Sequence, residues 1–193
     1  MTVMRDQVVR QLVQVEAKAN DDGLIPGFNV LVNQLPCSFW NTVSERMMAI
    51  TPPDRKAAME AALVNCAYEC GYHTGYGIIT SPEFESVVMP MVTEGAKDVL
   101  RGAYAVFTAW GWAKSGIVQI KEGEAMTIRA VDYYEADSGG EGRRAYMIRG
   151  VSAAFMELAY AAPYPNGMNT FKSEQTRGIE AGDQFGEFAV TKK

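Results

Sequence analysis

Two cysteines and the only histidine of the chain lie within eight residues, in the segment CAYECGYH at positions 66–73. On a helix, spacings of four and three place Cys66, Cys70 and His73 on one face. An imidazole lowers the pKa of a nearby thiol and makes it nucleophilic, and three such ligands hold a metal if a fourth joins them. No fourth ligand is evident. We therefore favour the simpler interpretation, in which the cysteines are core residues and the histidine serves a polar spot inside the protein.

His73 is nevertheless the best single candidate for contact with a ligand. It lies between Tyr72 and Tyr76 in a stretch that is free of charge. Imidazole donates to or accepts from a small phenolic or carbonyl group. We expect Tyr72, His73 and Tyr76 to contact a bound molecule, with His73 and Cys70 as the catalytic pair if the protein is an enzyme.

Aromatic and flexible apolar side chains supply the remaining candidates. Phe107, Trp110 and Trp112 cluster where a predicted helix meets a predicted strand, and such rings line apolar cavities while indole N–H groups add polar edges. Thioethers adapt to irregular cavities, and the chain has 11 methionines. Each residue taken alone also fits an ordinary core. As a set they favour a ligand pocket, to which we add Tyr133, Met147 and Phe155.

Helical periodicity covers most of the N-terminal two thirds of the chain. Apolar residues recur near every third or fourth position, and Ser81-Pro82 resembles a helix start. We predict helices at residues 1–18, 38–50, 51–79, 81–108 and 145–162. Residues 24–36 are ambiguous between a strand and irregular chain.

Alternation of apolar and polar residues replaces this pattern after Lys114. Two strands are predicted between residues 114 and 136 with a turn at Glu122-Gly123, and two more at 168–176 and 184–190. Residues 137–143, DSGGEGR, are predicted to form a polar loop. This order predicts an α+β fold in which long helices pack on one face of an antiparallel sheet of about four strands.

We divide the chain into an N-terminal helical arm and linker, residues 1–50, and a ligand-binding α+β domain, residues 51–193. The amphipathic arm is expected to pack on the domain or on a second subunit. A homodimer would be formed through this arm.

Composition excludes several classes of protein. The chain has 193 residues, 48% of them hydrophobic, and a formal net charge of -5, with no basic cluster for a phosphate backbone. We expect no nucleic-acid partner. No apolar run approaches the roughly 20 residues that span a bilayer, and the charged N-terminus is unlike a signal peptide. The three cysteines fit a reducing compartment. We therefore expect a soluble, cytoplasmic protein with no membrane partner.

Three stretches together resemble one known family. They are CGYHTG at 70–75, AWGW at 109–112 with the strands that follow, and EQTRGIEAGDQFGEFAV at 174–190. The last is similar to the pattern E-x-x-C-x-A-x-G-D-x-x-C-x-F of the 4-vinyl reductase or hydrocarbon-binding domain family, with Gly182, Asp183 and Phe188 in register. The resemblance covers about residues 60–191. It implies a fold shared with transport-particle subunits and nitric-oxide-sensing haem domains.

The two cysteines of that family pattern fall on Gly178 and Gly186 here. In relatives that keep them, thiolates bind a metal such as zinc and hold the hairpin together. Glycine has no ligand atom, so we predict that this chain keeps the hairpin, with Gly182-Asp183 as its turn, and binds no metal or other cofactor there.

The favoured hypothesis is a domain that encloses a small apolar or aromatic molecule and acts as a sensor or carrier. One alternative is an enzyme on the same scaffold that acts on a small aromatic or vinyl-bearing substrate through His73 and Cys70. Another is an assembly subunit similar to transport-particle proteins, whose cavity is filled by the chain itself or by an acyl group on Cys70.

Overall fold

Four strands of the C-terminal half form one antiparallel sheet in a computed structural model that describes residues 3–14, 18–33, 35–137, 142 and 144–193. The order across the sheet is β3-β4-β6-β5. Inward side chains alternate with exposed ones on β4 and β6, as expected of a sheet covered on one face. The strands are β3 (Ala113–Lys121), β4 (Ala125–Tyr133), β5 (Phe171–Arg177) and β6 (Gly186–Lys192).

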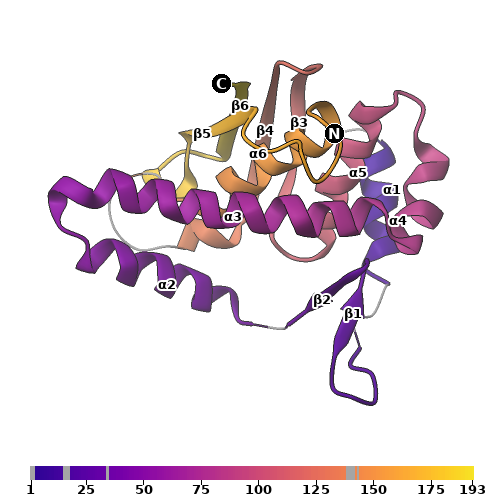
Figure 1. Ribbon diagram of the computed structural model, residues 1–193, viewed down its shortest axis with the longest axis horizontal. Coiled ribbons are helices and arrows are strands. Elements are labelled where there is room, and N and C mark those ends of the chain that lie inside the picture. The colour runs from indigo at the N-terminus through magenta and orange to yellow at the C-terminus, as the bar shows by residue number, and fades with distance from the viewer. Residues whose placement is uncertain (1–2, 15–17, 34, 138–141, 143) are drawn as a thin grey trace.

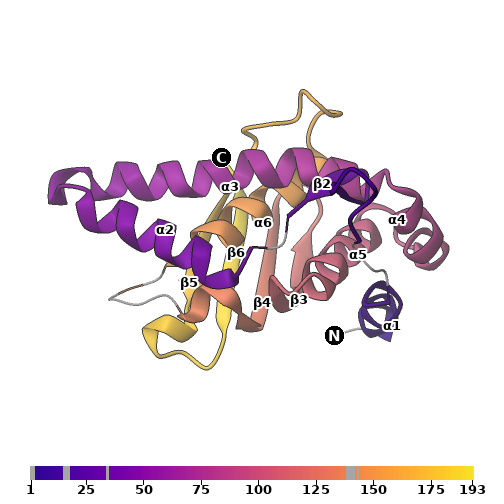
Figure 2. The same cartoon turned by 90° about the horizontal axis from the view of Figure 1, so that it is seen from below.

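Helices cover one face of this sheet, and α3 runs along the longest axis of the molecule (Figure 1). The longer helices are α1 (Val3–Leu12), α2 (Cys37–Ile50), α3 (Lys56–Ile79), α5 (Ala96–Ala109) and α6 (Tyr146–Tyr160). Figure 2 shows α6 between α3 and the sheet, and α1 against α5. The predicted α+β fold, with helices on an antiparallel sheet of four strands, is confirmed.

Glycines bring α3 and α6 into close contact. A β-carbon at Gly71 would lie 3.0 Å from Val151 Cα, and one at Gly75 would lie 2.8 Å from Leu158 Cδ1. A β-carbon at Gly150 would overlap the backbone of α3 at Val64 O. Small residues on both helices therefore let the two backbones approach, which explains the glycine spacing of CGYHTG.

The prediction of one helix over residues 81–108 is wrong. Ser81 does cap a helix, since its hydroxyl accepts from Phe84 N, but α4 (Pro82–Val87) lasts only six residues. Pro90 lies in a short 3-10 turn, and Gly95 has a φ of 58°, which favours glycine. The carboxylate of Asp98 then accepts from the amides of Thr93 and Glu94 at 2.8 Å and holds the break before α5.

The N-terminal segment is attached to the domain at two places. Val8 and Leu12 of α1 are buried in a core cluster that includes residues of α5. Residues 24–36, ambiguous in the sequence, contain a hairpin of β1 (Ile25–Gly27) and β2 (Val30–Val32). Phe28 in its turn is buried against Trp110, with ring centroids 5.0 Å apart.

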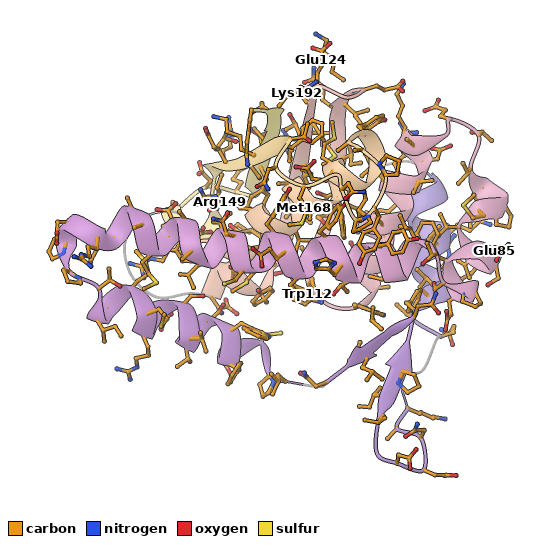
Figure 3. All side chains as sticks on the ribbon, viewed as in Figure 1. Glu85, Trp112, Glu124, Arg149, Met168 and Lys192 are labelled. Carbon is orange, nitrogen blue, oxygen red and sulfur yellow. The ribbon has the colours of Figure 1, made fainter. Side chains whose placement is uncertain are left out.

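The hairpins of the sheet match the predicted turns. Gly123 has a φ of 68° between β3 and β4, and Gly182 has a φ of 91° between β5 and β6. Figure 3 shows Glu124 at the end of the sheet away from α3, beside Lys192, whose amide donates to Glu124 O. Of the polar loop predicted at 137–143, residues 138–141 and 143 lie outside the described residues.

Within the described ranges, no helix is long and apolar enough to span a bilayer. The division at residue 50 stays a prediction.

Candidate functional site

An aromatic cluster lies between α5, α6 and the start of β3. Phe107 stacks on Trp112 with ring centroids 5.4 Å apart, and Phe155 of α6 contacts Phe107 at 6.1 Å. Tyr104, one turn before Phe107, meets the ring of Phe155 edge-on at 5.4 Å. We call Tyr104, Phe107, Trp112 and Phe155 the interior cluster. Three of its four members were candidates from the sequence.

Two hydroxyl groups inside this region lie beside each other and make no well-formed hydrogen bond. Tyr104 and Ser152 are each 1% exposed, and neither Tyr104 Oη nor Ser152 Oγ makes a well-formed hydrogen bond. Burial raises the pKa of the Tyr104 phenol, and the nearby Ser152 hydroxyl only partly offsets this effect. Buried polar atoms are normally paired, and two neighbouring hydroxyls that at most bond to each other retain capacity for a further hydrogen-bond partner. The sequence analysis missed both residues, although Tyr104 shares the apolar helix face of Phe107.

The cluster reaches the surface at Trp112, which is partly buried and meets Tyr134 edge-on at 5.5 Å. The Tyr134 hydroxyl is another buried group without a partner, and burial raises its pKa. Helix α2 covers this corner, because Asn41 Nδ2 donates to Tyr134 O at 2.8 Å. The rim of the interior cluster is therefore formed by Trp112, Tyr134 and α2.

A small cavity opens beside this corner. It measures about 10 Å³, room for about one water molecule, and Glu135 lies on its wall. Burial raises the pKa of the Glu135 carboxyl to about 8, despite hydrogen bonds from the amides of Met147 and Ile148 that lower it. The other lining residues are Asn41, Ser44, Glu45, Met48, Arg144 and Tyr146.

The three candidates on α3 contact the chain itself, at the connection between α6 and β5. His73 Nδ1 lies 3.0 Å from the hydroxyl of Tyr164, and the Tyr76 ring stacks on the Tyr164 ring at 3.9 Å. Tyr72 is fully buried, and its hydroxyl accepts from Gly167 N at 3.0 Å. A phenol, one of the two kinds of group expected at His73, is thus present as a tyrosine of the same chain.

The other candidates are dispersed. Trp110 packs on Phe28 outside the interior cluster, and Met147 lies in the first turn of α6 with its amide on Glu135. Tyr133 faces the β5–β6 connection. The structure therefore gathers Phe107, Trp112 and Phe155 in one place, and Tyr72, His73 and Tyr76 in another.

The expectation that Cys66, Cys70 and His73 are core residues is wrong. They do share one face of α3, but that face is exposed, because Gly71 and Gly75 direct the opposite side toward α6. Cys70 Sγ lies 3.8 Å from Thr74 Oγ1. Among the residues that the structure describes, no three His, Cys, Asp or Glu side chains are placed to hold a metal.

The positions of the two family cysteines are enclosed by polar side chains. A β-carbon at Gly178 would lie 2.7 Å from Gln175 Nε2, and one at Gly186 would lie 2.6 Å from the Tyr133 ring. Tyr133 donates its hydroxyl proton to Glu180, whose other oxygen accepts from Gln175 Nε2 at 2.7 Å. This network links β4, β5 and the β5–β6 connection, and it occupies the space that side chains at the two glycines would take.

The architecture defines the class of protein as an α+β domain with helices on one face of a four-stranded sheet. No family model and no curated protein matches the chain. Solved structures that share this fold include the following two. The phenol-responsive sensory domain of the transcription activator PoxR, solved with phenol, matches with a TM-score of 0.67 at 12% identity, over 100% of this chain and 91% of that one.

The second is a trafficking protein particle complex subunit 3 from Naegleria fowleri, covalently bound to palmitic acid. It matches with a TM-score of 0.56 at 16% identity, over 81% of this chain and 92% of that one. At such identities the likeness concerns the fold alone. It agrees with the fold implied by the family resemblance, while membership of the 4-vinyl reductase family stays a proposal.

Proposed function

We propose that the protein is a small-molecule-binding domain that takes an aromatic ligand carrying one polar group into the interior cluster, as a sensor or carrier. The observation that carries this proposal is the pair of buried hydroxyls of Tyr104 and Ser152, which make no well-formed hydrogen bond, beside the rings of Phe107 and Phe155. A buried polar group without a partner costs about 1–3 kcal/mol. A ligand hydroxyl that satisfies these groups would recover that free energy.

The chemistry of the site favours an aromatic guest. Rings gain from edge-to-face and offset stacked contacts, and Phe107, Trp112 and Phe155 offer both ring faces and edges. The fold-level likeness to a phenol-responsive domain supports a ligand of this class. Because the rings already contact one another, we expect a guest to enter by moving Trp112 or Tyr134 at the partly buried rim.

Binding of phenol and benzene to the purified chain tests the proposal. We expect phenol to raise the unfolding temperature and benzene to raise it less, because benzene cannot pair with the two hydroxyls. Ser152→Ala should weaken phenol binding about tenfold and leave benzene binding unchanged. Ser86→Ala, an exposed serine of α4, is the matched control. Equal responses to the two compounds, or no effect of Ser152→Ala, would contradict the assignment.

Native mass spectrometry of the protein as purified, repeated under denaturing conditions with metal analysis, identifies a resident guest. A small organic mass released on denaturation supports the proposal. A stoichiometric metal would instead contradict the prediction that the hairpin at Gly178 and Gly186 binds none.

The enzyme alternative would use His73 and Cys70 at the surface of α3, where His73 contacts Tyr164. Turnover of a bound ligand, lost on changing either residue without loss of fold, would favour it. The assembly-subunit alternative predicts an acyl mass on Cys70. A cytoplasmic location and a homodimer are further parts of the proposal, and sedimentation tests the second.

A further inference from the structure

One edge of α3, beside the α6–β5 connection, holds a phenol ring in the manner of a ligand. The ring of Tyr164 lies parallel to that of Tyr76, at an interplanar angle of 7° and a centroid distance of 3.9 Å. Its hydroxyl lies 3.0 Å from His73 Nδ1, and the imidazole ring meets it edge-on at 5.7 Å. Tyr72 adds a tilted ring contact at 5.4 Å. The Tyr76 ring and the Nδ1 nitrogen of His73 thus both contact the phenol of Tyr164.

The loop that carries Tyr164 is held by other contacts. Gly167 N donates to Tyr72, and Asn169 N donates to the hydroxyl of Tyr68. The amides of Thr170 and Phe171 donate to the buried carboxylate of Glu157 at 2.7 and 2.8 Å. The segment between α6 and β5 therefore stays anchored through its backbone if the Tyr164 side chain leaves α3.

The groups that hold the phenol remain accessible. His73 is exposed, Tyr76 is 38% exposed, and Tyr164 is partly buried. A free phenol offers the same ring face and the same hydroxyl as the tyrosine side chain. The stacking on Tyr76 and the hydrogen bond to His73 are available to any phenol. Only the covalent connection through the loop ties this phenol to the chain.

We propose that His73 and Tyr76 form a second site, for a phenolic ring, and that Tyr164 occupies this site as a tethered ligand. It is separate from the interior cluster, since it lies at the edge of α3 beside the α6–β5 connection, where Tyr164 packs on the buried Tyr72. A short tether gives its ligand an effective concentration in the millimolar range, so free phenols compete only when Tyr164 is removed or when they are abundant. Tyr164 thus sets the threshold at which the site responds.

Variants of Tyr164 test the proposal with 4-methylphenol, which matches the tyrosine side chain, and toluene, which lacks the hydroxyl. His73 is the only histidine, so histidine labelling gives a single side-chain NMR signal. In Tyr164→Ala, we expect 4-methylphenol to shift this signal with a midpoint at least about tenfold lower than in the unchanged protein. Toluene should shift it less, because it cannot bond to the imidazole.

A second variant controls for a change in the structure of the α6–β5 loop caused by Tyr164→Ala. Tyr164→Phe keeps the stacked ring and removes the hydroxyl, so its midpoint for 4-methylphenol should fall between those of the other two proteins. Tyr76→Ala in the Tyr164→Ala background should abolish the shift. The same midpoint in all three proteins, with each shown to be folded by circular dichroism, would overturn the proposal.

Ser152→Ala separates this site from the interior cluster. Added to Tyr164→Ala, it should leave the response of His73 to 4-methylphenol unchanged. A response that disappears with Ser152→Ala would assign the binding to the interior cluster alone and refute a site on α3. If the interior site fails its own test, a response that persists at His73 still supports the second site.

Discussion

Buried hydroxyl groups on the two sides of α6 differ in their hydrogen bonding. On the side that packs against α3, the hydroxyls of Tyr68 and Tyr72 each accept a backbone amide of the α6–β5 connection. On the side that faces α5, the hydroxyls of Tyr104 and Ser152 are also buried, and they lie beside each other without a well-formed hydrogen bond. The first pair therefore stabilises the fold of the chain, and the second pair is where we propose that a ligand binds.

The packing of the helices follows the same division. Glycines at the α3–α6 contact allow the two helix backbones to lie against each other. Between α5 and α6, by contrast, large aromatic rings separate the backbones. Rings can rotate or shift, but two backbones in contact cannot move apart without loss of many contacts at once. The proposed ligand would therefore enter more readily on the α5 side of α6.

The largest loss of stability is expected from a substitution in the close contact between α3 and α6. Gly150→Ala places a methyl group against Val64 O and the backbone of α3, and overpacking of this kind costs about 3 kcal/mol. Thermal unfolding should shift down by about 10 °C, as expected for a chain of this size. Gly27→Ala is the control, since nothing lies within 4 Å of its added carbon. Equal stability of the two variants would contradict the close α3–α6 contact.

Two matched substitutions test the contrast between the hydrogen-bonded hydroxyl of Tyr68 and the hydroxyl of Tyr104. Tyr68→Phe leaves the amide of Asn169 without its partner and removes one of three hydrogen bonds that Glu157 Oε1 accepts, so it should cost about 2 kcal/mol. Tyr104→Phe removes a hydroxyl that makes no well-formed hydrogen bond and should be neutral or stabilising in the absence of ligand. Urea unfolding measures both. Similar losses in the two variants would mean that the Tyr104 hydroxyl is satisfied within the chain.

The fold could be predicted because its signals are local. Helical periodicity, alternation after Lys114 and the glycine turns at 123 and 182 each depend on a few neighbouring residues. The helix prediction over 81–108 failed because apolar periodicity continues through Pro90 and Gly95, and the carboxylate that stabilises the break, Asp98, reads as an ordinary first-turn acid.

The candidate site could be predicted only in part, because it depends on distant segments. Helix geometry correctly placed Cys66, Cys70 and His73 on one face, but which face points outward is decided by contact with Gly150, almost eighty residues later. In the same way, the sequence indicated that His73 suits a phenol. It gave no sign that Tyr164 supplies one.

The buried carboxyl of Glu135 shows a third way in which a polar group is accommodated inside the protein, which is protonation to the uncharged form. Burial raises the pKa of Glu135 to about 8, and its hydrogen bonds from Met147 N and Ile148 N only partly offset this. Because the folded-state pKa exceeds the unfolded one, its contribution to stability is complete below about pH 4.5 and is lost as the pH rises through 8. We expect a loss of about 1–2 kcal/mol between pH 5 and 7.

Urea unfolding of the unchanged protein and of Glu135→Gln at both pH values measures this loss. The variant should show a smaller pH dependence, although it sacrifices one of the two amide hydrogen bonds. The same slope in both proteins would mean that Glu135 is charged in the fold at neutral pH and belongs with the paired groups on the α3 side.

The smallest effect is expected on the outer face of α3, which contributes to neither side of α6. Cys66 and Cys70 are exposed, so Cys66→Ser and Cys70→Ser should each change the free energy of unfolding by less than about 0.5 kcal/mol. Both thiols, together with exposed Cys37, should react with a thiol reagent without denaturant. Protection of Cys66 and Cys70, with Cys37 reactive, would show that this face is covered by a second copy or a bound group, and the phenol site at His73 would then lie inside an interface.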